Sequence, residues 1–194
     1  MIELLLALGA GLGLAAACGF RVFVPLLVAA VASRSGHLPL SNGFSWLATT
    51  PAIVALGCAT LLELAAYTFP WVDHALDTVA TPAAVVAGIL ASAAVMVDLP
   101  PSLRWAVSIV GGGAAAGLVQ GASVLLRLKS TAFTGGLANP LVALVEAIGG
   151  VGVALLAVLL PLVALIAVVV LLVVVFRGAG RVVFGRPAHP PPSS

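Results

Sequence analysis

Three charged side chains lie inside strongly apolar stretches of the sequence. Arg21, Glu63 and Glu146 are surrounded mainly by Ala, Val, Leu and Gly. A guanidinium group binds anions, and a carboxylate can bind a cation or carry a proton. We expect all three side chains to face the protein interior, with Arg21 paired to Glu63 or Glu146. Two interpretations follow: a substrate or ion pathway, or an ion pair that only fixes how the helices pack.

The composition indicates what surrounds these charges. The 194 residues are 62% hydrophobic and 7% charged, and the mean hydropathy is +1.28. Soluble domains carry roughly 25% charged residues, so this chain has too few to cover a soluble surface. A net charge of +2 also argues against a nucleic-acid partner, because no basic surface is available to meet phosphates. We therefore expect a membrane protein whose partners are lipids and a small ion or anionic solute.

A polar segment precedes Glu146 and contributes further candidate site residues. It ends in Asn139-Pro140, a capping residue followed by proline at the first helical position. Free backbone N–H groups at such a helix start attract anions. We expect a membrane-dipping loop that leads to the Glu146 carboxylate, or else an ordinary interfacial loop. The candidate residues in it are Ser130, Thr131, Thr134, Gly135, Gly136 and Asn139.

A second, acidic group consists of Asp73, His74 and Asp77. Their spacing places them on one arc of a helix. In the first interpretation, the two aspartates supply negative charge that stabilises the N-terminus of a helix. In the second, the three residues form a divalent-cation site. Elsewhere the sequence predicts no metal site and no cofactor. It contains no His-Glu-x-x-His motif and no serine or cysteine beside a base, so we do not expect an enzyme.

The elements that position these residues are predicted to be membrane-spanning helices, which need about 20 apolar residues each. The predicted fold is an all-α polytopic membrane bundle over residues 1–177, followed by a basic, Pro-rich, disordered cytoplasmic tail at 178–194. Five spans are the alternative to six, because Pro161 lies inside one long apolar run. The six predicted spans are 4–32, 51–69, 75–97, 103–127, 140–160 and 161–176.

Basic residues predict the orientation, because cytoplasmic loops are enriched in Lys and Arg. With six spans, both termini share one side of the bilayer. Arg34 and Arg104 fall on the other side, so five basic residues stand against two. We therefore expect both termini in the cytoplasm and the protein in the inner cell membrane, while a homo-oligomer is neither required nor excluded. The five are Arg127, Lys129, Arg177, Arg181 and Arg186.

The two halves of the chain also suggest a 3+3 inverted repeat. Pro51 and Pro140 each begin a helix, and a Gly-rich or Pro-containing interruption lies upstream of each, at residues 18–25 and 111–117. In transporters built from inverted repeats, interrupted helices at matching positions line the central site. The alternative is that the glycines only allow close helix packing, and that the matches arise by chance in an Ala/Val/Leu-rich chain.

The motifs resemble a bacterial multi-pass membrane family, domain of unknown function 4126. The likeness covers nearly the whole chain except the tail, and the sequence departs from the family pattern at Tyr67, Thr68 and Ala147. The resemblance implies an architecture and no activity. It rests on three motifs: Gly19-x-Arg21-x-Phe23-x-Pro25; Glu63 with Pro70, Asp73 and Asp77; and Ser130-Thr131-x-x-Thr134-Gly135-Gly136-x-x-Asn139-Pro140 before Glu146.

We therefore expect a small transporter or channel with a central polar site. A non-transporting structural or lipid-binding membrane protein is the alternative. In the first case, neutralising Glu63 or Glu146 changes flux; in the second, the charges only hold the bundle together.

Overall fold

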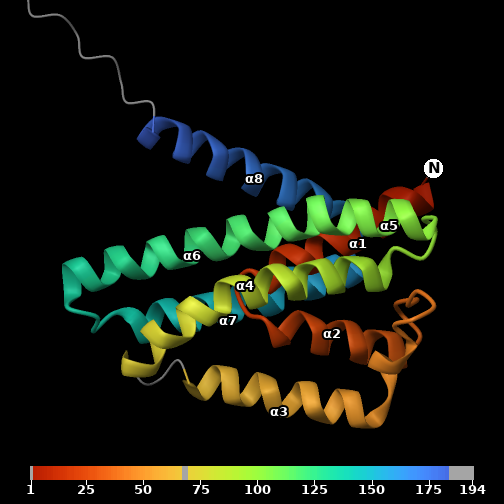
Figure 1. Ribbon diagram of the computed structural model, residues 1–194, viewed down its shortest axis with the longest axis horizontal. Coiled ribbons are helices and arrows are strands. Elements are labelled where there is room, and N and C mark those ends of the chain that lie inside the picture. Colours follow the sequence, from red (N-terminus) through yellow and green to blue (C-terminus); the bar gives the residue numbers. More distant parts are fainter. Residues whose placement is uncertain (1, 67–69, 184–194) are drawn as a thin grey trace, which may run out of the picture.

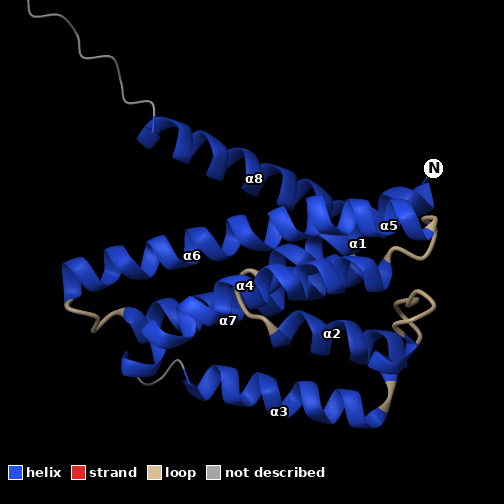
Figure 2. Cartoon of the chain, viewed as in Figure 1, coloured by secondary structure: helices blue, strands red, loops and turns tan. Residues whose placement is uncertain are grey.

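The computed structural model describes residues 2–66 and 70–183, and it describes no side chains for residues 67–78, 175, 176 and 178–183. In the described part all regular secondary structure is helical, as predicted, and no strand occurs (Figures 1 and 2). The helices are α1 (Ile2–Cys18), α2 (Phe23–Arg34), the 3-10 turn η1 (Ser45–Ala48), α3 (Thr50–Ala66), α4 (Pro70–Val95), α5 (Pro101–Val107), the π-helical turn η2 (Ser108–Gly112), α6 (Gly113–Thr134), α7 (Asn139–Leu159) and α8 (Pro161–Val183).

The first predicted span is in fact two antiparallel helices. α1 ends at Cys18, and α2 returns beside it, so that His37 lines the same groove as Glu3 (Figure 1). The prediction of one helix over residues 4–32 was wrong, and Pro25 gives the reason. Proline has no N–H to bond the carbonyl four residues earlier, and its ring clashes with that carbonyl, which here belongs to Arg21. We call α1 and α2 the helical hairpin and residues 19–22 its tip.

The remaining helices run the length of the bundle. α5, η2 and α6 form one continuous helix, Pro101–Thr134, and this helix and α7 are long and apolar enough to cross a bilayer. We call the end of the bundle with the 35–49 and 96–100 connections the loop end, and the end where Gly135–Ala138 joins α6 to α7 the turn end. The predicted break before Pro161 is present, with Leu160 outside both helices.

The ends of the described chain lie at opposite ends of the bundle. Glu3 shares its groove at the loop end with Asp98 and Pro161, whereas α8 runs from Pro161 toward the other end (Figure 1). The expectation that both termini lie in the cytoplasm stays a prediction. It counted residues 4–32 as one crossing, whereas the hairpin returns to the end of the bundle at which it starts.

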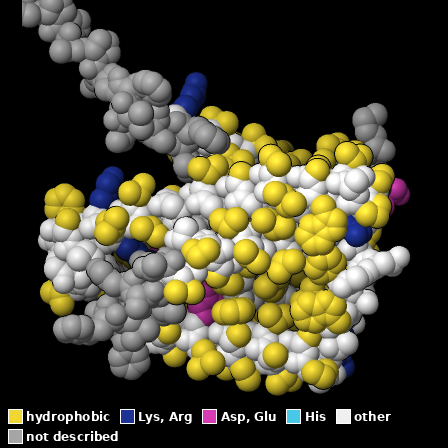
Figure 3. Space-filling model, in the orientation of Figure 1, with side chains coloured by type: hydrophobic (Ala, Val, Ile, Leu, Met, Phe, Trp, Pro, Cys, Tyr) yellow, Lys and Arg dark blue, Asp and Glu magenta, His cyan; other side chains and the backbone are white. Residues whose placement is uncertain are grey.

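Small side chains fill the middle of the bundle, where α1 packs against α4, α6, α7 and α8. A Cβ added to Gly88 would lie 2.5 Å from the Ala116 Cβ, and one added to Gly13 would lie 2.7 Å from the Ala157 Cβ. Larger hydrophobic side chains are exposed on the outside, and hydrophobic side chains are spread over the face in Figure 3. An alanine- and glycine-rich interior with an apolar exterior is typical of membrane helix bundles.

The two predicted interruptions differ in kind. Residues 18–25 contain a chain reversal, whereas the second interruption is only the π-helical turn η2, after which the helix continues. A Cβ on Gly112 would lie 2.8 Å from the Ser92 Cβ, so this glycine has a packing role. The inverted repeat stays a prediction.

Three predicted boundaries were wrong. α4 begins at Pro70, before the predicted start at residue 75, because proline is favourable at the first helical position. α6 continues beyond the predicted end of its span at residue 127 as far as Thr134, and Gly135 then ends it with φ +62°. α8 extends to Val183, beyond the predicted end of its span at residue 176, and residues 184–194 of the predicted tail lie outside the described residues.

Candidate functional site

The tip of the helical hairpin exposes backbone N–H groups that the carboxylate of Glu63 binds. The N–H of Val22 donates to Oε1 at 2.7 Å, and the N–H of Phe23 donates to Oε2 at 3.1 Å. The first N–H groups of a helix have no partner within it, and the helix dipole favours a negative charge there. Glu63, on α3, thus supplies the anion that the N-terminus of α2 attracts.

The tip can approach the rest of the bundle because of Gly19. A Cβ at this position would lie 2.5 Å from the carbonyl oxygen of Ala116 and 2.5 Å from the Cβ of Val119, both on α6. Only glycine allows the turn to lie this close to α6. The residue therefore fixes how deeply the hairpin inserts.

Among the side chains that the structure describes, Arg21 is the largest that is fully buried, and it points from the tip toward α7. Its side chain is 1% exposed, and Nη2 donates to the carbonyl oxygen of Ala143 at 2.7 Å and lies 3.8 Å from Oε2 of Glu146. The expected pairing of Arg21 with Glu146 is thus present. Glu63, the other expected partner, binds the backbone that follows Arg21.

Arg127 completes the cluster, and the sequence interpretation missed it by placing it at a helix end near the membrane surface. It lies well inside α6, its side chain is 5% exposed, and it forms a bidentate pair with Glu146. Nε donates to Oε1 at 3.3 Å, and Nη2 bonds Oε2. Glu146 therefore joins the guanidinium groups of two different helices.

The missed signal is a stripe of polar residues on α6. Gln120, Ser123 and Arg127 are buried at spacings of three and four, and Thr131 continues the same face. In a helix this apolar, polar residues at helical spacing mark the face that avoids lipid. That pattern could have identified Arg127 as an interior residue.

The four ionisable groups balance in charge and come from four elements: the tip, α3, α6 and α7. Arg127 and Glu146 are each seven residues from the end of their helix at the turn, so the cluster lies about 10 Å inside the turn end. Removing one partner from such a buried pair is costly, because it leaves a charge without compensation in a poorly solvated place. Arg21, Arg127 and Glu146 therefore form a fixed polar centre, displaced toward the turn end.

The 130–139 segment lies between the cluster and the turn end. Asn139 is buried, and its Nδ2 donates to Oγ1 of Thr131 at 3.1 Å, which ties α7 to α6 one turn beyond Arg127. Thr134 accepts a bond from the N–H of Ala138 at 3.2 Å and is exposed, as is Gly135. Gly136 has φ +90°, and the hydroxyl of Ser130 is buried without a hydrogen-bond partner. The segment is a hydrogen-bonded helix–turn–helix connection, and its depth in a membrane stays a prediction.

Asp73, His74 and Asp77 have backbone positions in the first turns of α4, but their side chains lie outside the part that the structure describes. Their suggested cation site stays a prediction. Among the residues with described side chains, no three His, Cys, Asp or Glu residues come together in a way that could hold a metal ion.

Comparison with known proteins gives one result, because no curated protein and no solved structure matches the chain. The match is to a protein family, and it confirms the resemblance carried by the Gly-x-Arg-x-Phe-x-Pro, Glu63 and Ser130–Asn139 motifs. The family model described as "Domain of unknown function (DUF4126)" matches residues 8–181, so the chain belongs to this family.

Proposed function

We propose that the protein is a multi-pass membrane transporter for a small monovalent anion, and that Glu63 occupies the anion position in the conformation described. The observation that carries the proposal is the carboxylate of Glu63 on the N–H groups of Val22 and Phe23. A position that holds a carboxylate by two N–H groups suits a small carboxylate such as formate, or an anion of similar size. Helix N-termini inside transporters bind anionic substrate groups in this way.

The charges beside this position support an anion over a cation. Arg21 and Arg127 share the single carboxylate of Glu146. If Glu63 takes up a proton and leaves, this group of three keeps one net positive charge next to two free N–H groups. An incoming anion would restore the balance, whereas a cation would add to the excess charge.

Glu63 is also placed to move. Glu63 is only half-buried. It lies on α3, which packs mainly on α2 and η1 at the edge of the bundle (Figure 1). The exchange we propose has two steps: a proton binds the carboxylate of Glu63, and the side chain then gives up its position to the anion. Each anion is thereby accompanied by one proton.

The test is simultaneous measurement of formate and proton uptake in proteoliposomes, with chloride and nitrate as further probes. Glu63→Gln resembles the protonated carboxyl group, so we expect formate uptake to continue while the accompanying proton uptake is lost. Arg21→Gln should reduce formate uptake by about tenfold or more, because it removes the net positive charge beside the anion position. Glu3→Gln, in the first turn of α1, is the control. Coupled uptake at the wild-type rate in both Glu63→Gln and Arg21→Gln would refute the proposal.

A second candidate is a non-transporting structural or lipid-binding protein. The paired network of Arg21, Arg127 and Glu146 favours it, because that network ties the hairpin, α6 and α7 together. In this case no anion should raise the melting temperature of the purified protein. The transporter proposal expects formate to raise it, and more so in Glu63→Gln.

We also propose that the turn end faces the cytoplasm, with the helical hairpin entering from the other side. Arg127 is internal and no longer counts as a loop charge, which leaves four basic residues (Lys129, Arg177, Arg181 and Arg186) against two (Arg34 and Arg104). This arrangement has five crossings and one re-entrant hairpin, and it places only the C-terminus in the cytoplasm. Cysteine-accessibility labelling of Asn42→Cys and Ser193→Cys in intact cells tests it.

A further inference from the structure

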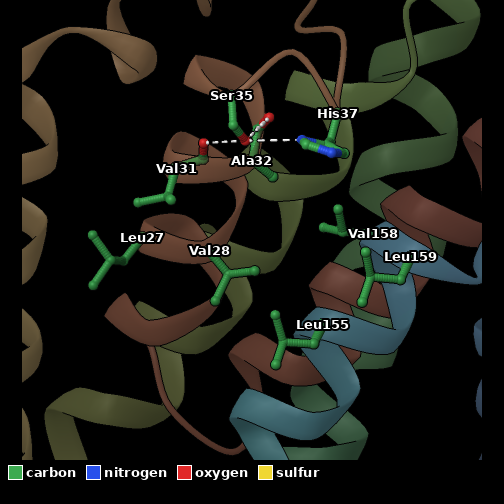
Figure 4. A pocket seen from close by; sticks show the side chains of 9 residues that line it. All are labelled: Leu27, Val28, Val31, Ala32, Ser35, His37, Leu155, Val158 and Leu159. Carbon is green, nitrogen blue, oxygen red and sulfur yellow. Dashed lines mark hydrogen bonds between the residues drawn. The ribbon is translucent and has the colours of Figure 1, made fainter.

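We infer that an anionic phospholipid binds at the loop end of α2, with its two acyl chains on either side of this helix. The first groove lies between α2 and α7 and has a volume of about 400 Å³ (Figure 4). Ser35 and His37 close it at one end, and Ser35 Oγ lies 3.1 Å from Nδ1 of His37. Its apolar walls are Leu27, Val28, Val31, Leu155, Val158 and Leu159.

A second groove flanks α2 on the side of α3. It has a volume of about 450 Å³ and is lined by Val31, Arg34, Ser35, Thr50 and Ile53. The two grooves share Val31 and Ser35, so they converge at the last turn of α2. Two apolar grooves that meet at one polar rim match the shape of a molecule with two acyl chains and one headgroup.

The rim has the charge that an anionic headgroup requires. Arg34 is exposed, Nη1 donates to Oγ1 of Thr50 at 2.6 Å, and within the described residues no carboxylate pairs with it. Its remaining N–H groups can bind a phosphate, with the Ser35 hydroxyl beside them. Glu3 and Asp98 line a neighbouring groove together with His37, and their negative charge would direct the phosphate toward Arg34.

Aromatic residues place this rim at headgroup depth. Trp46 is 56% exposed, and Phe44 and Trp105 lie with ring centroids 6.2 Å apart, all at the loop end. Trp is enriched where membrane proteins meet the headgroup layer. A lipid therefore fits the rim better than a second protein chain, which would have to cover exposed Arg34 and His37.

Lipid binding to the purified protein tests the inference. Native mass spectrometry should detect dioleoyl phosphatidylglycerol bound about fivefold more strongly than dioleoyl phosphatidylcholine, and Arg34→Gln should abolish that preference. Arg104→Gln, a basic residue at the same end, is the matched control and should keep it. Val31 lines both grooves, so Val31→Trp places a larger side chain in them and should weaken the binding of both lipids.

Three results would overturn the inference. The first is an equal preference for phosphatidylglycerol in Arg34→Gln and the wild type, and the second is unchanged lipid binding in Val31→Trp. The third is a concentration-dependent dimer that Val31→Trp disrupts, because a second copy would then occupy the grooves. Inorganic phosphate at the same concentration as the lipid should not displace it, because phosphate has no acyl chains to occupy the two grooves.

Discussion

The two interrupted segments of this chain both contain glycine, yet only one gathers charge. At the hairpin tip the backbone reverses, two N–H groups bind the carboxylate of Glu63, and Arg21 reaches Glu146. At η2 the helix continues, and Gly112 packs against Ser92 and Gly88 with no charged residue in the turn. Glycine alone thus marks close packing. A polar site arises where proline also prevents the helix from continuing and a carboxylate meets the freed N–H groups.

The largest effect should come from the charged network. Glu146→Gln leaves Arg21 and Arg127 without their shared carboxylate, so we expect the free energy of unfolding to fall by about 3–5 kcal/mol. Denaturant unfolding in detergent measures this loss. Glu3→Gln is the control and should change stability little. A Glu146→Gln variant as stable as the wild type would mean that the network contributes nothing to the fold.

A smaller loss of stability is expected from a substitution in η2, and it should leave formate uptake unchanged. Gly112→Val places side-chain atoms against Ser92 Cβ and the Gly88 carbonyl, at a cost of about 1–3 kcal/mol. Formate uptake per folded molecule should stay at the wild-type level. Gly57→Ala is the control, since nothing lies within 4 Å of its added Cβ. Loss of uptake in correctly folded Gly112→Val would place η2 in the transport path.

The cap at the hairpin tip should contribute less to stability. Glu63→Gln removes the charge but keeps an oxygen that can accept one N–H, so about 1 kcal/mol should be lost. The thermal unfolding midpoint measures this. A loss of stability as large as that of Glu146→Gln would mean that the main role of Glu63 is structural.

The smallest effect is expected at the turn end. Thr134→Val removes the hydroxyl that donates to the Ser130 carbonyl and accepts from the Ala138 N–H. The free energy of unfolding should therefore fall by about 0.5–1 kcal/mol. The hydroxyl is exposed and water can replace it, so formate uptake should stay the same. A clear drop in uptake would bring the 130–139 segment back into the site.

Much of the architecture could be predicted from local signals. The composition predicted an all-helical fold, and Pro161 predicted the break between α7 and α8. The pairing of Arg21 with Glu146 was predicted because an isolated charge inside an apolar bundle is costly. The chain reversal could not be predicted, because a proline four residues after Arg21 is compatible with a kink as well as with a hairpin. Arg127 was missed because its position was judged from the nearby polar segment and not from the helical spacing of Gln120, Ser123 and Thr131.

Infrared difference spectroscopy with and without formate tests most directly whether an anion replaces the carboxylate of Glu63 at the start of α2. Formate binding should produce the carbonyl stretch of a newly protonated carboxyl group. This band should disappear in Glu63→Gln and remain in the Glu3→Gln control. Formate binding without the band, or with the same band in Glu63→Gln, would contradict the account.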